Sequence, residues 1–212
     1  MWRRNGLSLV LFGLMAVFLA AQALTGWHVY NEELNQHGVA SIGLWSYLSS
    51  GHFISATFEN WESEFLQMGM YVLLTVRLRQ QGSAESRPLD PEEEETRIEP
   101  GPTPLPVLKG GLWKALYSHS LAIAFFALFF VSFSLHAVGS WEAKSAEDRL
   151  SGLLPPTFTE HLFSSDFWFE SMQNWQSEFL AVLALVILSI FLRQKDSPQS
   201  KALEAPHSQT GD

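Results

Sequence analysis

Two uncharged apolar stretches decide the fold of this chain: LSLVLFGLMAVFLAAQAL at residues 7–24 and LAIAFFALFFVSFSLHAV at residues 121–138. Each stretch has 18 residues and carries no Asp, Glu, Lys or Arg. About 20 helical residues cross the ~30 Å hydrocarbon core of a bilayer. We therefore expect both stretches to be transmembrane helices that are surrounded by lipid rather than by water.

Two further apolar runs, 65–76 and 179–192, are shorter, but an aromatic-rich segment without proline precedes each of them. With that segment each helix would have about 30 residues and a length of about 45 Å, enough to cross the membrane. The sequence therefore predicts an all-α membrane protein with four transmembrane helices. The expected spans are about 7–24, 57–77, 121–138 and 172–192.

The basic residues of the chain are distributed unequally between the two sides of this four-span topology. Lys144 and Arg149 fall on one side. The other eleven of the thirteen Lys and Arg residues fall on the opposite side: Arg3, Arg4, Arg77, Arg79, Arg87, Arg97, Lys109, Lys114, Arg193, Lys195 and Lys201. Loops rich in Lys and Arg stay in the cytoplasm. We therefore expect a multi-pass protein of the cytoplasmic (inner) membrane with both termini in the cytoplasm.

The first apolar run also has features of a secretory signal, because Arg3 and Arg4 precede it and Ala21-Gln22-Ala23 resembles a cleavage site. The run is longer than the usual apolar core of a signal. Its counterpart at 121–138 is internal, where a signal peptide has no role. These two observations favour a first helix that is retained as a transmembrane span.

The chain aligns with itself when it is shifted by 114 residues, without a gap, from about residue 6 to about residue 90. NWESEFL at 60–66 falls on NWQSEFL at 174–180, and Trp27 falls on Trp141. This pattern predicts a tandem duplication of a two-helix unit. Because each unit crosses the membrane twice, the halves should be related by a parallel pseudo-two-fold axis along the membrane normal. We place the two repeats at 1–81 and 113–195.

The segments outside the repeats have the composition of disordered chain. Residues 82–112 form a proline-rich linker that contains the acidic run at 92–95, and residues 196–212 form a polar tail. Neither segment can bury a core, so we expect both to be disordered in the cytoplasm. The formal net charge of −9 makes nucleic acid an unfavourable partner. The expected partners are the lipid bilayer and either a second copy or another membrane protein.

The chain resembles a family of uncharacterised bacterial membrane proteins that is known only as a domain of unknown function. The matching stretches are Arg4-Asn5-Gly6-Leu7-Ser8, Leu24-Thr25-Gly26-Trp27, and the segments at 58–67 and 167–180. The resemblance implies a bacterial membrane location. It implies no activity, ligand or catalytic residue.

A polar stripe on the second and fourth spans is the predicted intramembrane site. Its members in the first repeat stand at i, i+3, i+4 and i+7, so they share one helix face. The stripe consists of Asn60, Ser63, Glu64 and Gln67, with Asn174, Ser177 and Glu178 in the second repeat. Under the pseudo-two-fold symmetry Glu64 and Glu178 could approach each other and share a proton or bind a cation. Alternatively, the stripe holds neighbouring helices together by hydrogen bonds.

Aromatic residues and histidines are the other candidate functional residues of the chain. Six aromatic residues are expected at the membrane interface or in helix packing: Trp27, Trp61, Phe65, Trp141, Trp175 and Phe179. His28, His37, His52 and His161 are expected on the outer side, but they lack metal-ligand spacing, and His136 is expected to bond at the edge of the bundle. The chain has no cysteine and no recognised catalytic motif. We expect no metal, no cofactor and no catalytic residue.

Three functions are compatible with these features. The leading hypothesis is a non-catalytic membrane module that self-associates or scaffolds a partner. The alternative is a small ion or proton channel or transporter that uses Glu64 and Glu178. The third is an outer-face membrane enzyme that uses the histidines and the acidic residues near them.

Overall fold

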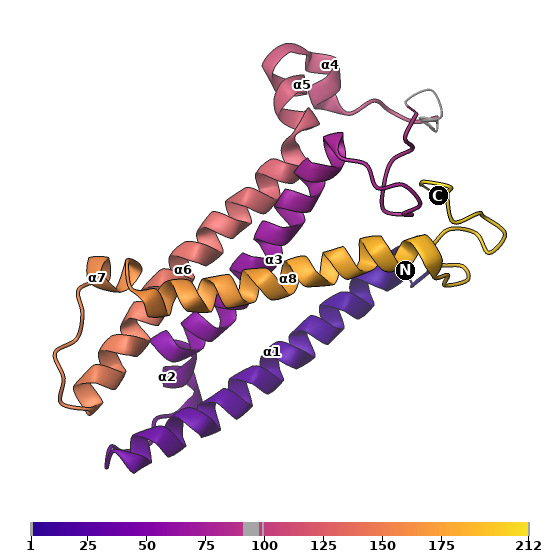
Figure 1. The fold of residues 1–212 in the computed structure, drawn as a ribbon. Helices are drawn as coiled ribbons and strands as arrows, with labels where there is room; N and C mark the ends of the chain where they lie inside the picture. Colours follow the sequence, from indigo (N-terminus) through magenta and orange to yellow (C-terminus); the bar gives the residue numbers. More distant parts are fainter. Residues whose placement is uncertain (1, 91–97, 99, 212) are drawn as a thin grey trace. The chain divides into compact units, whose positions relative to one another are not determined.

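The structure is a computed structural model that describes residues 2–90, 98 and 100–211. Within these residues every regular element is a helix, and the predicted all-α class is confirmed (Figure 1). The elements are α1 (Trp2–Gln36), α2 (Leu44–Leu48), α3 (Gly51–Arg77), α4 (Leu105–Lys109), α5 (Gly111–Ser118), α6 (Ser120–Leu150), α7 (Phe158–Leu162) and α8 (Ser165–Phe191). The acidic run at 92–95 lies outside the described residues.

Three helices are long and apolar enough to cross a membrane: Arg4–Gln36 of α1, and all of α6 and α8. This finding supports the predicted association with a membrane. The remaining predicted span lies in α3, which has 27 residues, as many as α8. Glu59, Glu62 and Glu64 lie in the first half of α3 and lower its mean hydropathy.

The side chains are distributed in the opposite way from those of a water-soluble protein. Glu62, Ser63 and His136 are fully buried, whereas Leu7 is 75% exposed and Phe130 is 63% exposed. Apolar surface on this scale would be strongly unfavourable in water. It is favourable against lipid chains, where polar groups have to find partners inside the protein.

Local geometry recurs along the chain with an offset of 114 residues. The bounds of α2 and α3, shifted by 114, coincide with those of α7 and α8. Gly38 and Gly152 both have φ of +72°, the left-handed conformation that ends α1 and α6. The indole N–H of Trp27 donates to the Ile42 carbonyl (2.7 Å), and that of Trp141 donates to the Pro156 carbonyl (2.9 Å).

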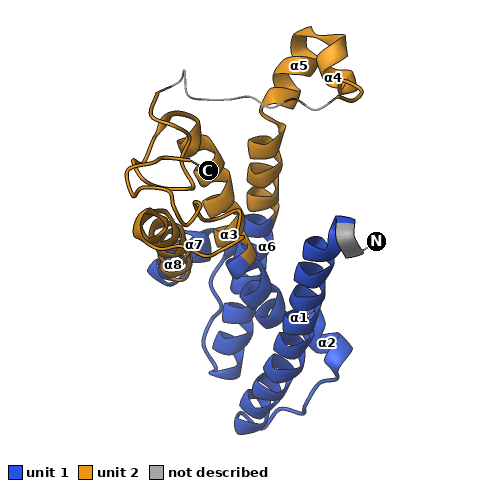
Figure 2. Ribbon diagram, turned by 90° about the vertical axis from the view of Figure 1, so that its right-hand side faces the viewer, with its two compact units in different colours: residues 1–60, 132–169 blue, residues 61–131, 170–212 orange. Residues whose placement is uncertain are grey.

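The chain divides into two compact units (Figure 2). Unit 1 comprises Met1–Asn60 and Ser132–Phe169, and unit 2 comprises Trp61–Val131 and Glu170–Asp212. In unit 1 the start of α3 crosses α6 at two glycines. A Cβ on Gly51 would lie 2.6 Å from the Gly139 carbonyl oxygen, and a Cβ on Gly139 would lie 2.6 Å from the Ser55 nitrogen. The two backbones approach this closely because neither glycine has a side chain.

In unit 2 the packing between α3, α6 and α8 involves aromatic rings. A Cβ on Gly69 of α3 would lie 3.3 Å from the ring of Phe126 on α6. Phe129 of α6 meets Trp175 of α8 edge to face, with 6.0 Å between the ring centroids. Edge-to-face pairs are favoured by the ring quadrupoles and add to the stabilisation from buried area.

The C-terminal tail makes specific contacts in unit 2, in contrast to the disorder that its composition predicts. Lys201 is buried, and its ammonium donates to four backbone carbonyls: those of Gly82, Pro206, His207 and Gln209. The Gly82 N–H donates to the Thr210 hydroxyl (2.9 Å), and the Gly211 N–H donates to the Ser83 carbonyl (3.0 Å). The tail is therefore joined to the first residues of the linker by hydrogen bonds rather than by an apolar core.

These contacts predict how the tail responds to loss of the Lys201 ammonium. Lys201→Ala should leave the carbonyls without their donor, and each charge-assisted bond contributes about 1.5–3 kcal/mol. We expect a non-specific protease to cut within 197–211 at least about tenfold faster in this variant, because local opening governs such cleavage. The control is Lys195→Ala, which removes an exposed lysine. Equal cleavage of Lys201→Ala and the wild type would contradict the role of Lys201.

Candidate functional site

The predicted polar stripe on α3 is divided between buried and exposed positions. Ser63 and Gln67 are buried, whereas Glu64 is exposed. Asn60 belongs to unit 1 and is also exposed, and its side-chain amide donates to the Ala56 carbonyl (2.9 Å). The 100° turn per residue thus brings only part of the stripe into the protein interior.

Two residues of the stripe on α8 make hydrogen bonds within their own helix. The Asn174 amide donates to the Glu170 carbonyl (3.1 Å), and the Ser177 hydroxyl donates to the Asn174 carbonyl (2.8 Å). Hydrogen bonds of this kind satisfy the side chain locally. Asn174 and Ser177 thus each have a hydrogen-bond partner on α8.

Glu64 and Glu178 are brought together in unit 2, where their carboxyl groups share a side-chain hydrogen bond and interact electrostatically. A hydrogen bond between two carboxyl groups requires a proton on one of them, because two carboxylates have acceptors only. The charged forms also repel each other at this range. The two carboxyl groups therefore form a close acidic pair. It lies on the surface of unit 2, since Glu64 is exposed and Glu178 is half-buried.

Glu62 is a buried carboxyl group outside the predicted polar stripe. It is fully buried, and its Oε1 accepts a hydrogen bond from the indole N–H of Trp175 (3.1 Å). Trp175 was predicted to pack, and this bond adds a polar role to its contact with Phe129. The self-alignment of the chain contains one sign of this role, because the position that corresponds to Glu62 carries Gln176, which is exposed. A buried indole N–H generally needs an acceptor, and Glu62 supplies it.

The other predicted aromatic residues fall into two groups. Trp27 and Trp141 are half-buried in unit 1 and bond to loop carbonyls. Trp61 and Phe65 are half-buried on α3, and Phe179 on α8 lines a cavity of unit 2. The two indoles of unit 1 thus secure the connections after α1 and α6.

His136 is a buried histidine on α6. Its ring lies against Phe167, with 4.9 Å between the centroids, and a ring nitrogen lies within 4.8 Å of a Glu59 carboxylate oxygen. All three residues belong to unit 1. His136 is therefore placed in the interior, whereas we had expected it at the edge of the bundle. Its neighbour Glu59 was not selected from the sequence.

The histidines expected on the outer side engage separate neighbours in unit 1. His28 lies beside the Trp27 ring (4.9 Å), and His161 Nε2 lies 2.9 Å from the Ser140 hydroxyl. His37 is exposed. His28 and His161 thus contact different residues of unit 1.

His52 pairs with the buried Tyr47 of α2. The Tyr47 hydroxyl lies 3.1 Å from His52 Nδ1, and burial lowers the pKa of His52, an effect that Glu33 partly offsets. The neutral ring is therefore the favoured form, and its Nδ1 can accept a hydrogen bond from the Tyr47 hydroxyl. Gly26 of α1 leaves space for this hydroxyl, because a Cβ there would overlap it.

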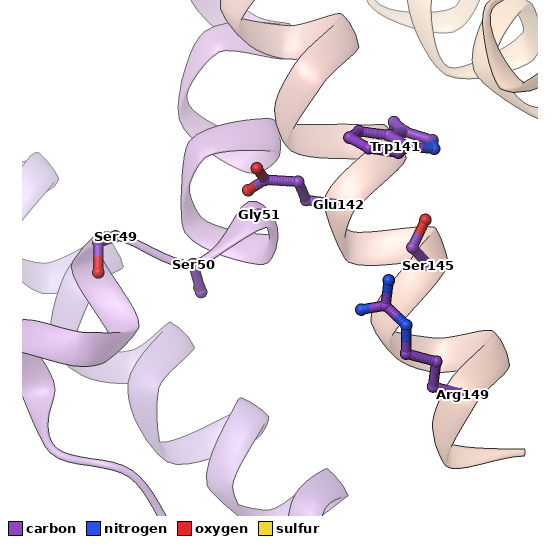
Figure 3. Close-up of a pocket in the computed structure, with 7 residues that line it drawn as sticks. All are labelled: Ser49, Ser50, Gly51, Trp141, Glu142, Ser145 and Arg149. Carbon is purple, nitrogen blue, oxygen red and sulfur yellow. The ribbon is translucent and has the colours of Figure 1, made fainter. Parts of the chain in front are cut away.

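A cavity of about 350 Å³ opens in unit 1 between the start of α3 and the end of α6 (Figure 3). Its lining residues are Ser49, Ser50, Gly51, Trp141, Glu142, Ser145 and Arg149. Glu142 points toward Gly51, and the Arg149 guanidinium lies next to Ser145. The cavity offers one acidic and one basic side chain, but none of the residues that we predicted for the polar site.

Comparison with known proteins gives a family but no function. A family model described as "Domain of unknown function (DUF6766)" matches residues 1–212. No curated protein and no solved structure matches the chain.

The contact between Gly26 and Tyr47 predicts a rescue experiment. Gly26→Ala should destabilise the outer part of unit 1 by about 1–3 kcal/mol, because the added methyl overlaps a fully buried hydroxyl. Tyr47→Phe removes the hydroxyl and should restore most of the thermal stability of Gly26→Ala. Gly13→Ala is the control, since its Cβ would meet no atom within 4 Å. The measurement is thermal unfolding in detergent. If the losses of stability of the two single variants simply added in the double variant, the proposed overlap between the methyl group added at position 26 and the Tyr47 hydroxyl would be contradicted.

The bond between Glu62 and Trp175 predicts a loss of stability. Trp175→Phe removes the N–H donor and should lower stability by about 1–3 kcal/mol, or several degrees in apparent Tm. Glu62→Gln should have a smaller effect, because its amide oxygen can still accept the bond. Gln176→Ala, at the exposed counterpart of Glu62, serves as the control. If Trp175→Phe and Gln176→Ala had the same apparent Tm, the hydrogen bond between Glu62 and Trp175 would contribute nothing measurable to stability.

Proposed function

The chain belongs to this family of unknown function, and we propose that it works as a non-catalytic membrane module that self-associates. In this proposal four transmembrane helices cross the cytoplasmic membrane of a bacterium, and both termini face the cytoplasm. The association uses the surface of unit 2 that carries Glu64 and Glu178. Each part of the proposal has its own support.

Length and charge support α3 as the fourth span. At about 1.5 Å per residue, the 27 residues of α3 extend about 40 Å, more than the hydrocarbon thickness. Arg77 and Arg79 follow its apolar half, as Arg193 and Lys195 follow that of α8. This equivalence favours the same crossing direction for α3 and α8, and the excess of basic residues at these ends favours the cytoplasm.

The recurrence at 114 residues supports tandem duplication of a two-helix unit. Not only the helix bounds but also side-chain contacts recur: Arg79 Nη1 donates to the carbonyls of Thr75, Val76 and Leu78, and Arg193 Nη1 donates to those of Ser189, Ile190 and Leu192. Unrelated helices would have no reason to share such details. A duplicated pair of spans suggests an ancestor that assembled as a dimer.

The observation that carries the proposed self-association is the exposed carboxyl pair. Glu64 and Glu178 each lie 13 residues before the last residue of their helices, about 20 Å along the axis. This depth is inside the hydrocarbon of a four-span protein. A carboxyl group that faces lipid there costs a few kcal/mol. Coverage of the pair by protein would remove that cost.

A second copy is the partner that this surface fits best. Two-fold association brings the same patch of each copy together, so the patch has to be self-complementary. A carboxyl pair that holds one proton, which we propose for Glu64 and Glu178, offers both a donor and acceptors, and the exposed Ser177 hydroxyl oxygen adds a further acceptor. The surface can therefore form hydrogen bonds with a copy of itself.

The ion or proton channel remains the alternative, because two carboxyl groups as close as those of Glu64 and Glu178 could also bind and release a proton. Such a passage would run between copies, since the pair is exposed on one chain. We do not propose an outer-face enzyme, because His28, His52 and His161 each engage a different neighbour: Trp27, Tyr47 and Ser140.

Self-association is tested by the dimer fraction in liposomes as protein is diluted into lipid. Glu64→Leu combined with Glu178→Leu should weaken dimerisation roughly tenfold, because intramembrane polar contacts contribute about 1 kcal/mol each. Glu32→Leu, which removes an exposed acid at the end of α1, is the control. Wild-type protein that stays monomeric at every dilution would refute the proposal. Proton flux through wild-type liposomes that Glu64→Gln with Glu178→Gln abolishes would favour the channel.

A further inference from the structure

A second cavity, of about 370 Å³, lies in unit 2 between the C-terminal parts of α3 and α8. Most of its wall is apolar: Leu74, Leu78, Phe179, Val182, Leu183 and Val186. It is also lined by Arg79 and Glu85, which carry opposite charges. The cavity thus combines an apolar groove with one cation and one anion, and neither Glu64 nor Glu178 lines it.

Glu85 is fixed in place although it lies beyond the end of α3. The Tyr71 hydroxyl donates to its carboxylate Oε2 (3.2 Å), and the Glu85 N–H donates to the Ser83 hydroxyl oxygen (3.2 Å). The Ser83 hydroxyl in turn lies 2.8 Å from the Ser189 hydroxyl on α8. These bonds connect the carboxylate to both helices that form the cavity.

Arg79 is fixed by the last turn of α3. Its Nη1 donates to the carbonyls of Thr75 (2.9 Å), Val76 (3.2 Å) and Leu78 (3.2 Å). The guanidinium also has N–H donors on Nη2 and Nε. A planar guanidinium held in this way is suited to bind a phosphate.

In the proposed four-span topology, on which this inference rests, the cavity lies at the boundary between lipid chains and headgroups. Val186 lies five residues before the end of α8, and Arg79 lies two residues after the end of α3. Basic residues at the ends of transmembrane helices lie at headgroup level. An occupant from the bilayer would therefore present its headgroup to Arg79 and Glu85 and an acyl chain to the groove.

We propose that this cavity binds a zwitterionic phospholipid with a primary ammonium headgroup, such as phosphatidylethanolamine. The Arg79 guanidinium binds its phosphate, the Glu85 carboxylate accepts hydrogen bonds from its ammonium, and the groove takes part of an acyl chain. A choline headgroup has no N–H to donate. An anionic glycerol headgroup has no cation and would place its phosphate beside the Glu85 carboxylate.

The second repeat offers a natural contrast to this site. Arg193 corresponds to Arg79, but its Nη2 donates to the Ala205 carbonyl of the tail (3.1 Å). Gln199 stands at the position that corresponds to Glu85, and its side-chain amide lies against the Glu85 carboxylate. The pair of opposite charges on a groove is therefore a property of the first repeat.

The test is titration of the purified full-length protein, in mild detergent, with three phospholipids of identical acyl chains, read by native mass spectrometry. The headgroups are ethanolamine, choline and glycerol. We expect the ethanolamine lipid to bind roughly tenfold more tightly than either other lipid, which is the effect of one charge-assisted hydrogen bond. Equal binding of the three lipids by the wild type would overturn the proposal without any variant.

The variants separate the contributions of the two charges and the groove. Glu85→Gln should abolish the preference for ethanolamine over choline, and Arg79→Gln should weaken all three lipids. Val182→Trp, which fills the groove, should also weaken all three. Arg77→Gln is the matched control, because Arg77 is exposed and does not line the cavity. Unchanged lipid preference in Glu85→Gln, with helical content and monodispersity equal to the wild type, would likewise overturn the assignment.

Discussion

The absence of water from the bilayer interior is the constraint on which the rest of the structure depends. A polar group at hydrocarbon depth has no solvent partner, so the protein has to provide one. Among the described residues Glu62, Ser63 and His136 are fully buried, whereas many leucine and phenylalanine side chains are exposed. Trp175 donates to Glu62 and so gives this buried carboxyl group a partner within the protein. The apolar surface, which would drive aggregation in water, is the surface that lipid solvates.

This constraint also explains how much of the fold could be predicted from sequence. Apolar runs of 18 residues leave little choice but a membrane helix, so α1 and α6 were predictable, and the glycines at 38 and 152 were visible in the repeat. Helix α3 is not among the helices that are apolar enough to cross a membrane by composition, because its glutamates lower its mean hydropathy. Span prediction uses the composition of one segment, whereas the burial of Glu62 depends on a tryptophan 113 residues away.

The candidate site was predicted only in part for a related reason. Helical spacing identified a polar face, and approximate symmetry suggested that Glu64 and Glu178 lie near each other, as they do in unit 2. Spacing alone could not determine which polar face of α3 is buried, because Glu62, Ser63 and Glu64 are consecutive and point in three directions. The tail was missed because its contacts are hydrogen bonds to backbone carbonyls, which leave little trace in composition.

The glycine crossing in unit 1 has a mechanical consequence. A Cβ on Gly51 would also lie 2.6 Å from the Glu142 Cβ, and a Cβ on Gly139 would lie 2.8 Å from the Ile54 side chain. A residue larger than glycine at either position would therefore force the start of α3 and the C-terminal half of α6 apart, so the crossing sets the spacing of these two backbones.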